Sequence, residues 1–155
     1  MTGLNAMNPY VKDRSFPDCF PKDFATSILP DDAMPIAHKG YRLCKSGAVT
    51  RQDFVSTCEE RLVRLFSQRK VQKKPLPRDP SCYSTSCYSD LKELQYVKQF
   101  VMKKVPPEAV IAEGVTAPEC GLSRQSSRTS HIDWWIYKDT APETYFTAIG
   151  EEVTS

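Results

Sequence analysis

The residue types most suited to chemistry lie in two short segments. The first, HIDWWIY at 131–137, combines an imidazole, a carboxylate, two indoles and a phenol, a mixture typical of binding sites. The second, YSTSCYS at 83–89, places hydroxyl groups on both faces of an expected strand, although an interior strand is usually apolar on at least one face. Both segments are therefore candidates for a functional site.

Alternation along 131–137 separates the side chains of the first segment into two faces. Ile132, Trp134 and Ile136 fall on one face, which we expect to lie in the core. The opposite face carries His131, Asp133, Trp135 and Tyr137. On that face the carboxylate can fix the tautomer of the imidazole, so these two residues are candidate catalytic groups. The alternative is that the two aromatic residues pack beneath the amino-terminal segment and the histidine is a satisfied residue at the strand end.

The hydroxyl-rich segment also has two interpretations. Ser84, Thr85 and Ser86 are suited to hydrogen bonding with the ribose or phosphate oxygens of a ligand. Alternatively, 81–88 is an edge strand with water on one of its faces, where serine and threonine are common.

Arg42, in an expected strand at 41–44, and the later Ser84-Thr85-Ser86 resemble the first two motifs of the arginine-serine-glutamate class of ADP-ribosyltransferases. In that family the arginine binds the phosphate and nicotinamide-ribose region of NAD, and the serine-threonine-serine strand shapes the nicotinamide pocket. The resemblance implies that Arg42, Ser84, Thr85 and Ser86 bind NAD as a substrate. It implies an ADP-ribosyltransferase-like or NAD glycohydrolase-like enzyme.

The third motif of that family supplies a catalytic glutamate, which stabilises an oxocarbenium-like transition state. Its usual form, Glu-x-Glu or Gln-x-Glu, is not found after residue 86. Among the single glutamates that remain, Glu113 is the best candidate for the catalytic role, because it lies beside Gly114 on an expected strand.

Positive charge gathers in one stretch, although the net charge of the chain is only +2. Residues 61–78 carry no acidic side chain and seven cations: Arg61, Arg64, Arg69, Lys70, Lys73, Lys74 and Arg78. Such a stretch can meet a phosphate backbone or an acidic surface. The second hypothesis is therefore a non-catalytic binding or accessory protein that engages nucleic acid or an acidic protein partner. A solvated helix end and loop is the plainer interpretation.

A zinc site and a nucleophilic pair of Cys87 or Cys120 with His131 are weaker alternatives. Four residues, Cys82, Cys87, Cys120 and His131, offer ligands for zinc, but they lack the close pairs typical of structural zinc sites. We therefore expect no metal.

The chain carries six cysteines, and its first residues show no secretory signal, so we expect reduced thiols. Because there is also no long apolar run, we expect a cytoplasmic protein without membrane contact, of undetermined oligomeric state.

The elements that must position these residues form, by prediction, an α+β fold with a mixed sheet and three to four helices packed on it. We expect strands at 41–44, 81–88, 109–115 and 132–137, and helices at 22–28, 51–68, 91–104 and 141–149. The first long helix is expected to start at an N-cap on Thr50 and to turn an apolar face that includes Phe66 toward the core. At 155 residues the chain suits a single domain spanning 1–155. Within it we expect a proline-rich arm, 1–38, that wraps the core, an exposed basic loop at 69–80, and a polar loop at 117–130.

Overall fold

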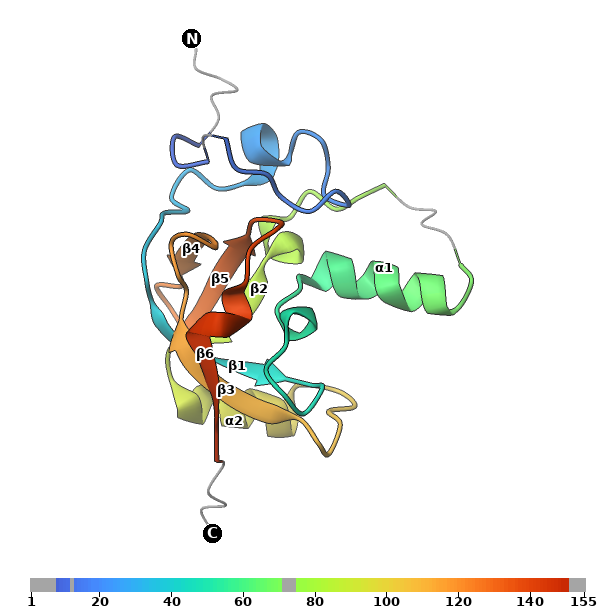
Figure 1. Cartoon of the computed structure of the whole chain (residues 1–155), viewed down its shortest axis with the longest axis vertical. Coiled ribbons are helices and arrows are strands. Elements are labelled where there is room, and N and C mark those ends of the chain that lie inside the picture. Colours follow the sequence, from blue (N-terminus) through green and yellow to red (C-terminus); the bar gives the residue numbers. More distant parts are fainter. Residues whose placement is uncertain (1–7, 12, 71–74, 151–155) are drawn as a thin grey trace.

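A six-stranded sheet forms the centre of the computed structural model, which describes residues 8–11, 13–70 and 75–150 (Figure 1). The strands are β1 (Lys39–Cys44), β2 (Thr85–Tyr88), β3 (Val110–Val115), β4 (Gly121–Gln125), β5 (His131–Ile136) and β6 (Phe146–Ile149). Their order is β4-β5-β2-β1-β3-β6. The α+β class is confirmed. The pairings between these strands are all antiparallel, in place of the expected mixed sheet, and β2 is an interior strand, so the edge-strand interpretation is wrong.

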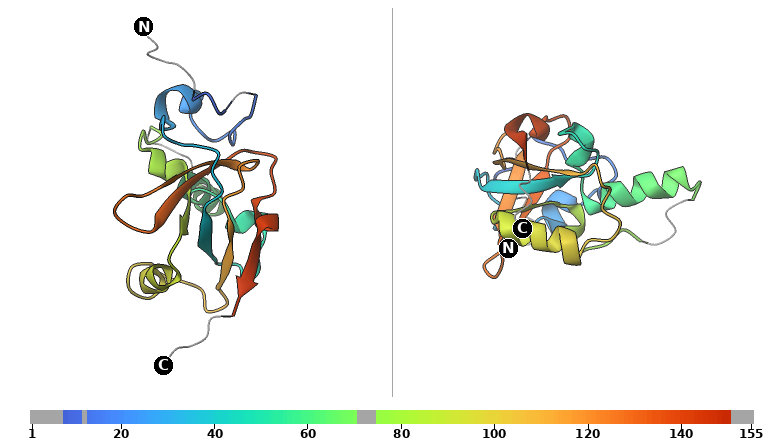
Figure 2. Two further views of the ribbon diagram at one scale, coloured as in Figure 1. Left: turned by 90° about the vertical axis from the view of Figure 1, so that its left-hand side faces the viewer. Right: turned by 90° about the horizontal axis from the view of Figure 1, so that it is seen from below.

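In the described part of the chain, two α-helices accompany the sheet, α1 (Thr57–Ser67) and α2 (Leu91–Phe100). The same residues also form four short helical turns: η1 (Phe24–Ile28), η2 (Arg51–Asp53), η3 (Pro80–Tyr83) and η4 (Pro142–Tyr145). Helix α2 packs on one face of the sheet, where Leu94 meets Leu43 and Ile111 (Figure 2). Within the described residues, no helix has the length and apolar character needed to cross a membrane.

Helix α1 begins six residues later than predicted. Its cap is Ser56, whose hydroxyl accepts a hydrogen bond from Glu59 N at 3.1 Å, while the Glu59 carboxylate accepts from Ser56 N at 3.0 Å. This reciprocal pair is a capping box. The expected start at Thr50 is therefore wrong, because that residue caps only the short turn η2.

Two strands occupy segments predicted to be a loop and a helix. Strand β4 lies in the expected loop and pairs with β5, and β6 lies in the expected final helix and pairs with β3. The capping pattern at Thr140 yields only the single turn η4. The following Phe146–Ile149 is rich in β-formers and completes the free edge of β3. Gly114 permits this pairing, because a Cβ there would meet the Tyr145 carbonyl oxygen.

The amino-terminal arm packs against the β4–β5 end of the sheet. Its buried apolar residues, Val11, Phe20, Phe24, Ile28 and Leu29, form one core cluster with Tyr83, Leu122, Trp135 and Tyr137. The arm is also tied to the sheet by the bridge between Met34 and Ser123.

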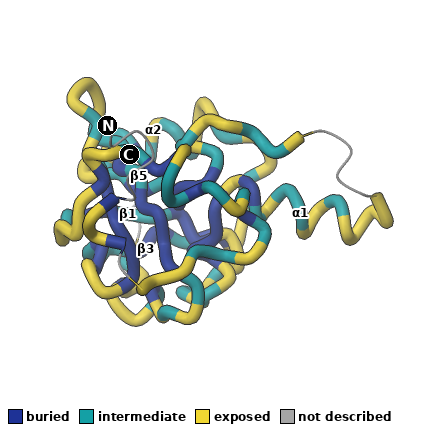
Figure 3. Tube along the Cα trace, turned by 90° about the horizontal axis from the view of Figure 1, so that it is seen from above, coloured by how far each residue is buried: buried dark blue, intermediate teal, exposed yellow. Residues whose placement is uncertain are grey.

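Helix α1 projects away from the sheet (Figures 1 and 3). It contacts the body through η3 and through Cys58, which is buried in the same core cluster as the arm. Its carboxyl-terminal half is mostly exposed. The fold therefore presents this half of the helix to the surroundings and does not bury it.

Candidate functional site

Four of the predicted site residues meet on the face of the sheet that α2 covers in part. The register places Ser86 opposite Asp133 and Tyr88 opposite His131. Ser84 Oγ donates a hydrogen bond to Asp133 Oδ1 at 2.7 Å, and His131 Nε2 lies 2.9 Å from Ser86 Oγ. We call Ser84, Ser86, His131 and Asp133 the polar cluster.

The polar cluster is a largely closed network. Ser84 is buried and its hydroxyl also contacts the Ser81 carbonyl oxygen at 3.2 Å. Asp133 is 13% exposed, and its second oxygen faces the Arg124 guanidinium at 3.6 Å. The second ring nitrogen of His131 is 3.9 Å from Asp133 Oδ1, which is beyond hydrogen-bond distance. These contacts join β2, β4 and β5, as buried or half-buried polar groups must find partners.

Arg42 starts from the other face of the sheet, since it pairs with Ala112 of the opposite core cluster. Its guanidinium reaches past β1 to main-chain oxygens: Nε donates to Asp53 O at 3.0 Å and Nη1 donates to Ser86 O at 2.8 Å. Strands β1 and β2 are paired at only one position, Tyr41 with Tyr88. The guanidinium therefore satisfies a carbonyl that a longer ladder would have satisfied. Arg42 meets the backbone of the polar cluster, not its hydroxyl groups.

Glu113 lies far from the polar cluster. It occupies the same row across the sheet as Tyr41, Tyr88 and His131, so three strand spacings, about 14 Å, separate it from the imidazole. Its nearest cation is Lys39 at 4.0 Å. The residues of the ADP-ribosyltransferase resemblance therefore do not converge on one cleft, and NAD use stays a hypothesis from the sequence.

Three further predicted binding residues are packed in the core. Trp135 is fully buried and its indole N–H donates to Pro80 O at 2.9 Å. Tyr137 is buried beneath the arm, with Arg14 stacked 4.4 Å above its ring. Thr85 is buried and pairs with Trp134 on the opposite face. For Trp135 and Tyr137, the structure follows the packing alternative.

The predicted basic stretch is divided between different roles. Arg78 forms two hydrogen bonds with the Asp23 carboxylate, at 3.1 and 2.9 Å, and these lower the pKa of Asp23. Arg78 therefore links the chain before η3 to the amino-terminal arm. Lys73 and Lys74 lie outside the described residues. The remaining cations, Arg61, Arg64, Arg69 and Lys70, lie on α1 or directly after it.

Apolar side chains are exposed beside those cations. Val63 is 57% exposed and Phe66 is 83% exposed, while Leu62 and Leu65 are half-buried. Together with Lys70 they line a shallow groove of about 450 Å³. The prediction that Phe66 belongs to the core is wrong. The sequence held no signal for this outcome, because positions 62, 63, 65 and 66 all fall on one side of a helix.

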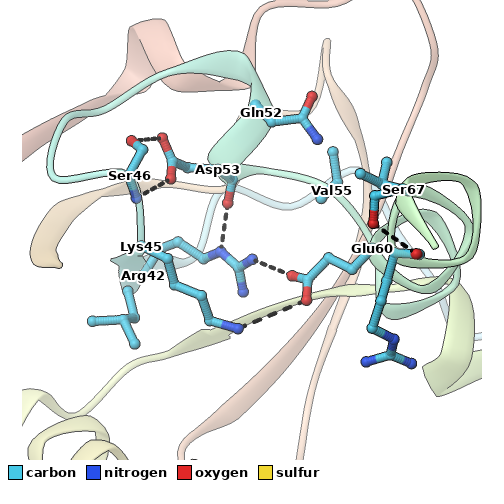
Figure 4. A pocket seen from close by; sticks show the side chains of 11 residues that line it. Arg42, Lys45, Ser46, Gln52, Asp53, Val55, Glu60 and Ser67 are labelled. Carbon is cyan, nitrogen blue, oxygen red and sulfur yellow. Dashed lines mark hydrogen bonds and ion pairs between the residues drawn. The ribbon is translucent and has the colours of Figure 1, made fainter. Parts of the chain in front are cut away.

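A deeper cleft of about 530 Å³ lies on the other side of α1, between this helix, η2 and the end of β1 (Figure 4). Charged groups line it: Arg42, Lys45, Asp53, Glu60 and Arg64. Val55 and Val63 add apolar wall, and Val63 lines the shallow groove as well. Sequence reasoning missed Lys45, Asp53 and Glu60 as site residues. They carry no shared motif, and only the folding of η2 and α1 against β1 brings them together.

Two of the cysteines interact with each other, since a hydrogen bond between the Cys19 and Cys58 thiols lowers the pKa of Cys58. All six are free, and Cys87 and Cys120 are buried in the core cluster around Trp134. Burial raises the pKa of the Cys87 thiol to about 12, so it is a poor nucleophile. In the part of the chain that the structure describes, no three His, Cys, Asp or Glu side chains are grouped to hold a metal ion.

Comparisons with known proteins leave the geometry as the basis for a functional conclusion. No family model matches the chain, and no curated protein or solved structure is significantly similar to it.

Proposed function

We propose that this protein is a non-catalytic binding protein that docks an acidic protein partner on helix α1. The observation that carries the proposal is the exposure of Val63 and Phe66 on a helix that projects from the body (Figure 3). Phe66, at 83% exposed, keeps most of its contact with water in the folded protein.

The apolar residues favour a protein partner. A contiguous exposed apolar surface flanked by polar groups is typical of protein interaction sites, and a large aromatic side chain is a frequent anchor at the centre of such sites. On α1 the exposed Val63 and Phe66 adjoin the half-buried Leu62 and Leu65. A phosphate backbone would engage the neighbouring cations but would gain nothing from the aliphatic side chains.

The charges favour an acidic partner. Four cations, Arg61, Arg64, Arg69 and Lys70, lie along and just beyond α1, against two carboxylates near its start, Glu59 and Glu60. Glu59 is engaged in the capping box. Complementary charge at the rim of an interface raises the association rate and disfavours basic partners.

The test begins with a photoreactive phenylalanine analogue at position 66, compared with the same analogue at position 100 on α2. Phe100 is a matched control, since it is 65% exposed on the other helix. A protein crosslinked from position 66 is then purified and its affinity measured by calorimetry. We expect V63S/F66S to weaken binding by about a hundredfold and Y96S/F100S to change it by less than about twofold.

Two results would contradict the proposal. One is a purified partner that binds V63S/F66S as tightly as the unchanged protein. The other is the absence of any protein ligand while nucleic acid, or vesicles of anionic lipid, bind through α1.

A further inference from the structure

The charged cleft beside α1 has a cation that is fixed in place before any ligand arrives. Two of the three nitrogens of Arg42 donate to main-chain oxygens, those of Asp53 and Ser86. The third, Nη2, faces the cleft, where its nearest carboxylate oxygen, on Glu60, is 3.9 Å away (Figure 4). The side chain of Arg42 is only 13% exposed. A guanidinium that is both immobile and largely desolvated is well suited to hold a carboxylate.

Asp53 does not supply the missing counter-ion, although it lines the same cleft. Its carboxylate accepts four hydrogen bonds, from the main-chain N–H and hydroxyl groups of Ser46 and Thr50, at 2.6–3.1 Å. Burial raises the pKa of Asp53, but these hydrogen bonds outweigh burial and hold it below its usual value. Asp53 is thus charged at neutral pH, and its oxygens are occupied by the turn around η2.

Glu60 is left as a loose counter-ion for Arg42 and Lys45. Its two oxygens lie 3.9 Å from Arg42 Nη2 and 3.7 Å from Lys45 Nζ, both beyond hydrogen-bond distance. Its side chain is 45% exposed, so it can leave the cleft without a large loss of packing. Arg64 makes no ion pair with any residue that the structure describes.

We infer that this cleft receives an acidic side chain of the docked protein, in the place that Glu60 holds loosely in the free protein. The inference rests on the proposed function, because Val63 joins the cleft to the shallow groove that contains Phe66. The partner segment therefore carries an aspartate or glutamate next to an apolar anchor. The carboxylate enters between Arg42, Lys45 and Arg64, and the anchor covers Val63 and Phe66.

Selection from a library of random dodecapeptides displayed on phage tests this recognition rule without knowledge of the natural partner. The unchanged protein is compared with K45E/R64E, which reverses two cleft charges, with V63S/F66S, and with K92E/K103E, a matched reversal of two exposed cations at α2. We expect the unchanged protein and K92E/K103E to enrich peptides that pair an acidic with a large apolar residue. K45E/R64E is expected to lose the acidic preference and to keep the apolar one.

An enriched peptide is then measured by fluorescence anisotropy. We expect replacement of its acidic residue by the amide to weaken binding about tenfold with the unchanged protein and less than twofold with K45E/R64E. E60Q is expected to strengthen binding about threefold, because it removes the competing carboxylate.

The outcomes separate the two proposals. Enriched peptides that are apolar but lack a preference for Asp or Glu overturn the cleft inference and leave α1 as a docking surface. If the enriched peptides bind V63S/F66S as tightly as the unchanged protein, or if no peptide is enriched, the proposal of docking on α1 is wrong, and the cleft inference fails with it. If inorganic phosphate displaces the peptide at concentrations where acetate does not, the cleft is a phosphate site and the inference is wrong.

Discussion

The polar cluster and the charged cleft both gather ionisable side chains, but they differ in how those groups are partnered. In the polar cluster, Ser84, Ser86, His131 and Asp133 make contacts of 2.7 and 2.9 Å with one another. In the cleft, Glu60 faces its cations at 3.7 and 3.9 Å. The hydrogen-bonding groups of the polar cluster join strands to one another. The charged groups of the cleft have no close partners and are available to a ligand. Residue type alone therefore does not distinguish a structural network from a binding site.

Arg42 gives the largest expected effect on stability, because it belongs to the cleft and also supports the sheet. We expect R42M to lower the free energy of unfolding by about 3 kcal/mol, since it leaves the carbonyl oxygens of Asp53 and Ser86 without their donor. K45M is the matched control: its side chain is half exposed, so we expect a change within about 0.5 kcal/mol. Urea denaturation measures both. Equal losses of stability in R42M and K45M would contradict the structural role that the contacts assign to Arg42.

Asp133 tests whether the polar cluster is structural. We expect D133A to lower the free energy of unfolding by about 2 kcal/mol, because the buried Ser84 loses its 2.7 Å hydrogen bond to the carboxyl group and keeps only the 3.2 Å contact with Ser81 O. Affinity for the enriched acidic peptide should be unchanged. K45E/R64E should behave in the opposite way, with lost affinity and nearly unchanged stability. If D133A is fully folded and yet loses peptide binding, the polar cluster is not purely structural.

Asp53 gives a smaller and pH-dependent effect. Because its pKa is lowered in the folded protein, its stabilisation is present above the unfolded-state value of about 3.9 and is lost as the pH falls through the folded-state value. We expect D53N to cost about 1 kcal/mol at neutral pH, and the gap from the unchanged protein to close below about pH 4. Thermal unfolding across this pH range measures the gap, and a gap that widens in acid would contradict the assignment.

NAD turnover is the smallest expected effect. Because Arg42, the polar cluster and Glu113 do not share a cleft, we expect no release of nicotinamide when the purified protein is incubated with NAD. Chromatography of the reaction mixture checks this. Release that is lost in both S86A and E113Q would make the polar cluster an active site and restore the enzyme hypothesis.

The sequence predicted those helices and strands that are determined by neighbouring residues in the chain. The cap at Asp90 and the apolar spacing around Leu94 predicted α2, and alternation predicted the core face of β5. The start of α1 was missed because two capping patterns compete, and Ser56 with Glu59 prevails over Thr50. Strand β6 was missed because its pairing with β3 is a long-range contact that a local helix pattern does not report.

The candidate site was less predictable than the fold. His131 and Asp133 were identified by residue type, and their meeting with Ser84 and Ser86 depends on a register between strands far apart in the chain. The cleft was missed altogether. Lys45 and Glu60 come close only because η2 turns the chain back toward β1, and the availability of their charges depends on distances that a sequence does not contain.

The attachment of α1 at its amino-terminal end has a consequence for the thermodynamics of docking. The capping box fixes the start of the helix, and Cys58 in its first turn is buried in the core cluster of the arm. A helix anchored in this way loses little rotational freedom when a partner binds, so the entropic cost of association falls mainly on the partner.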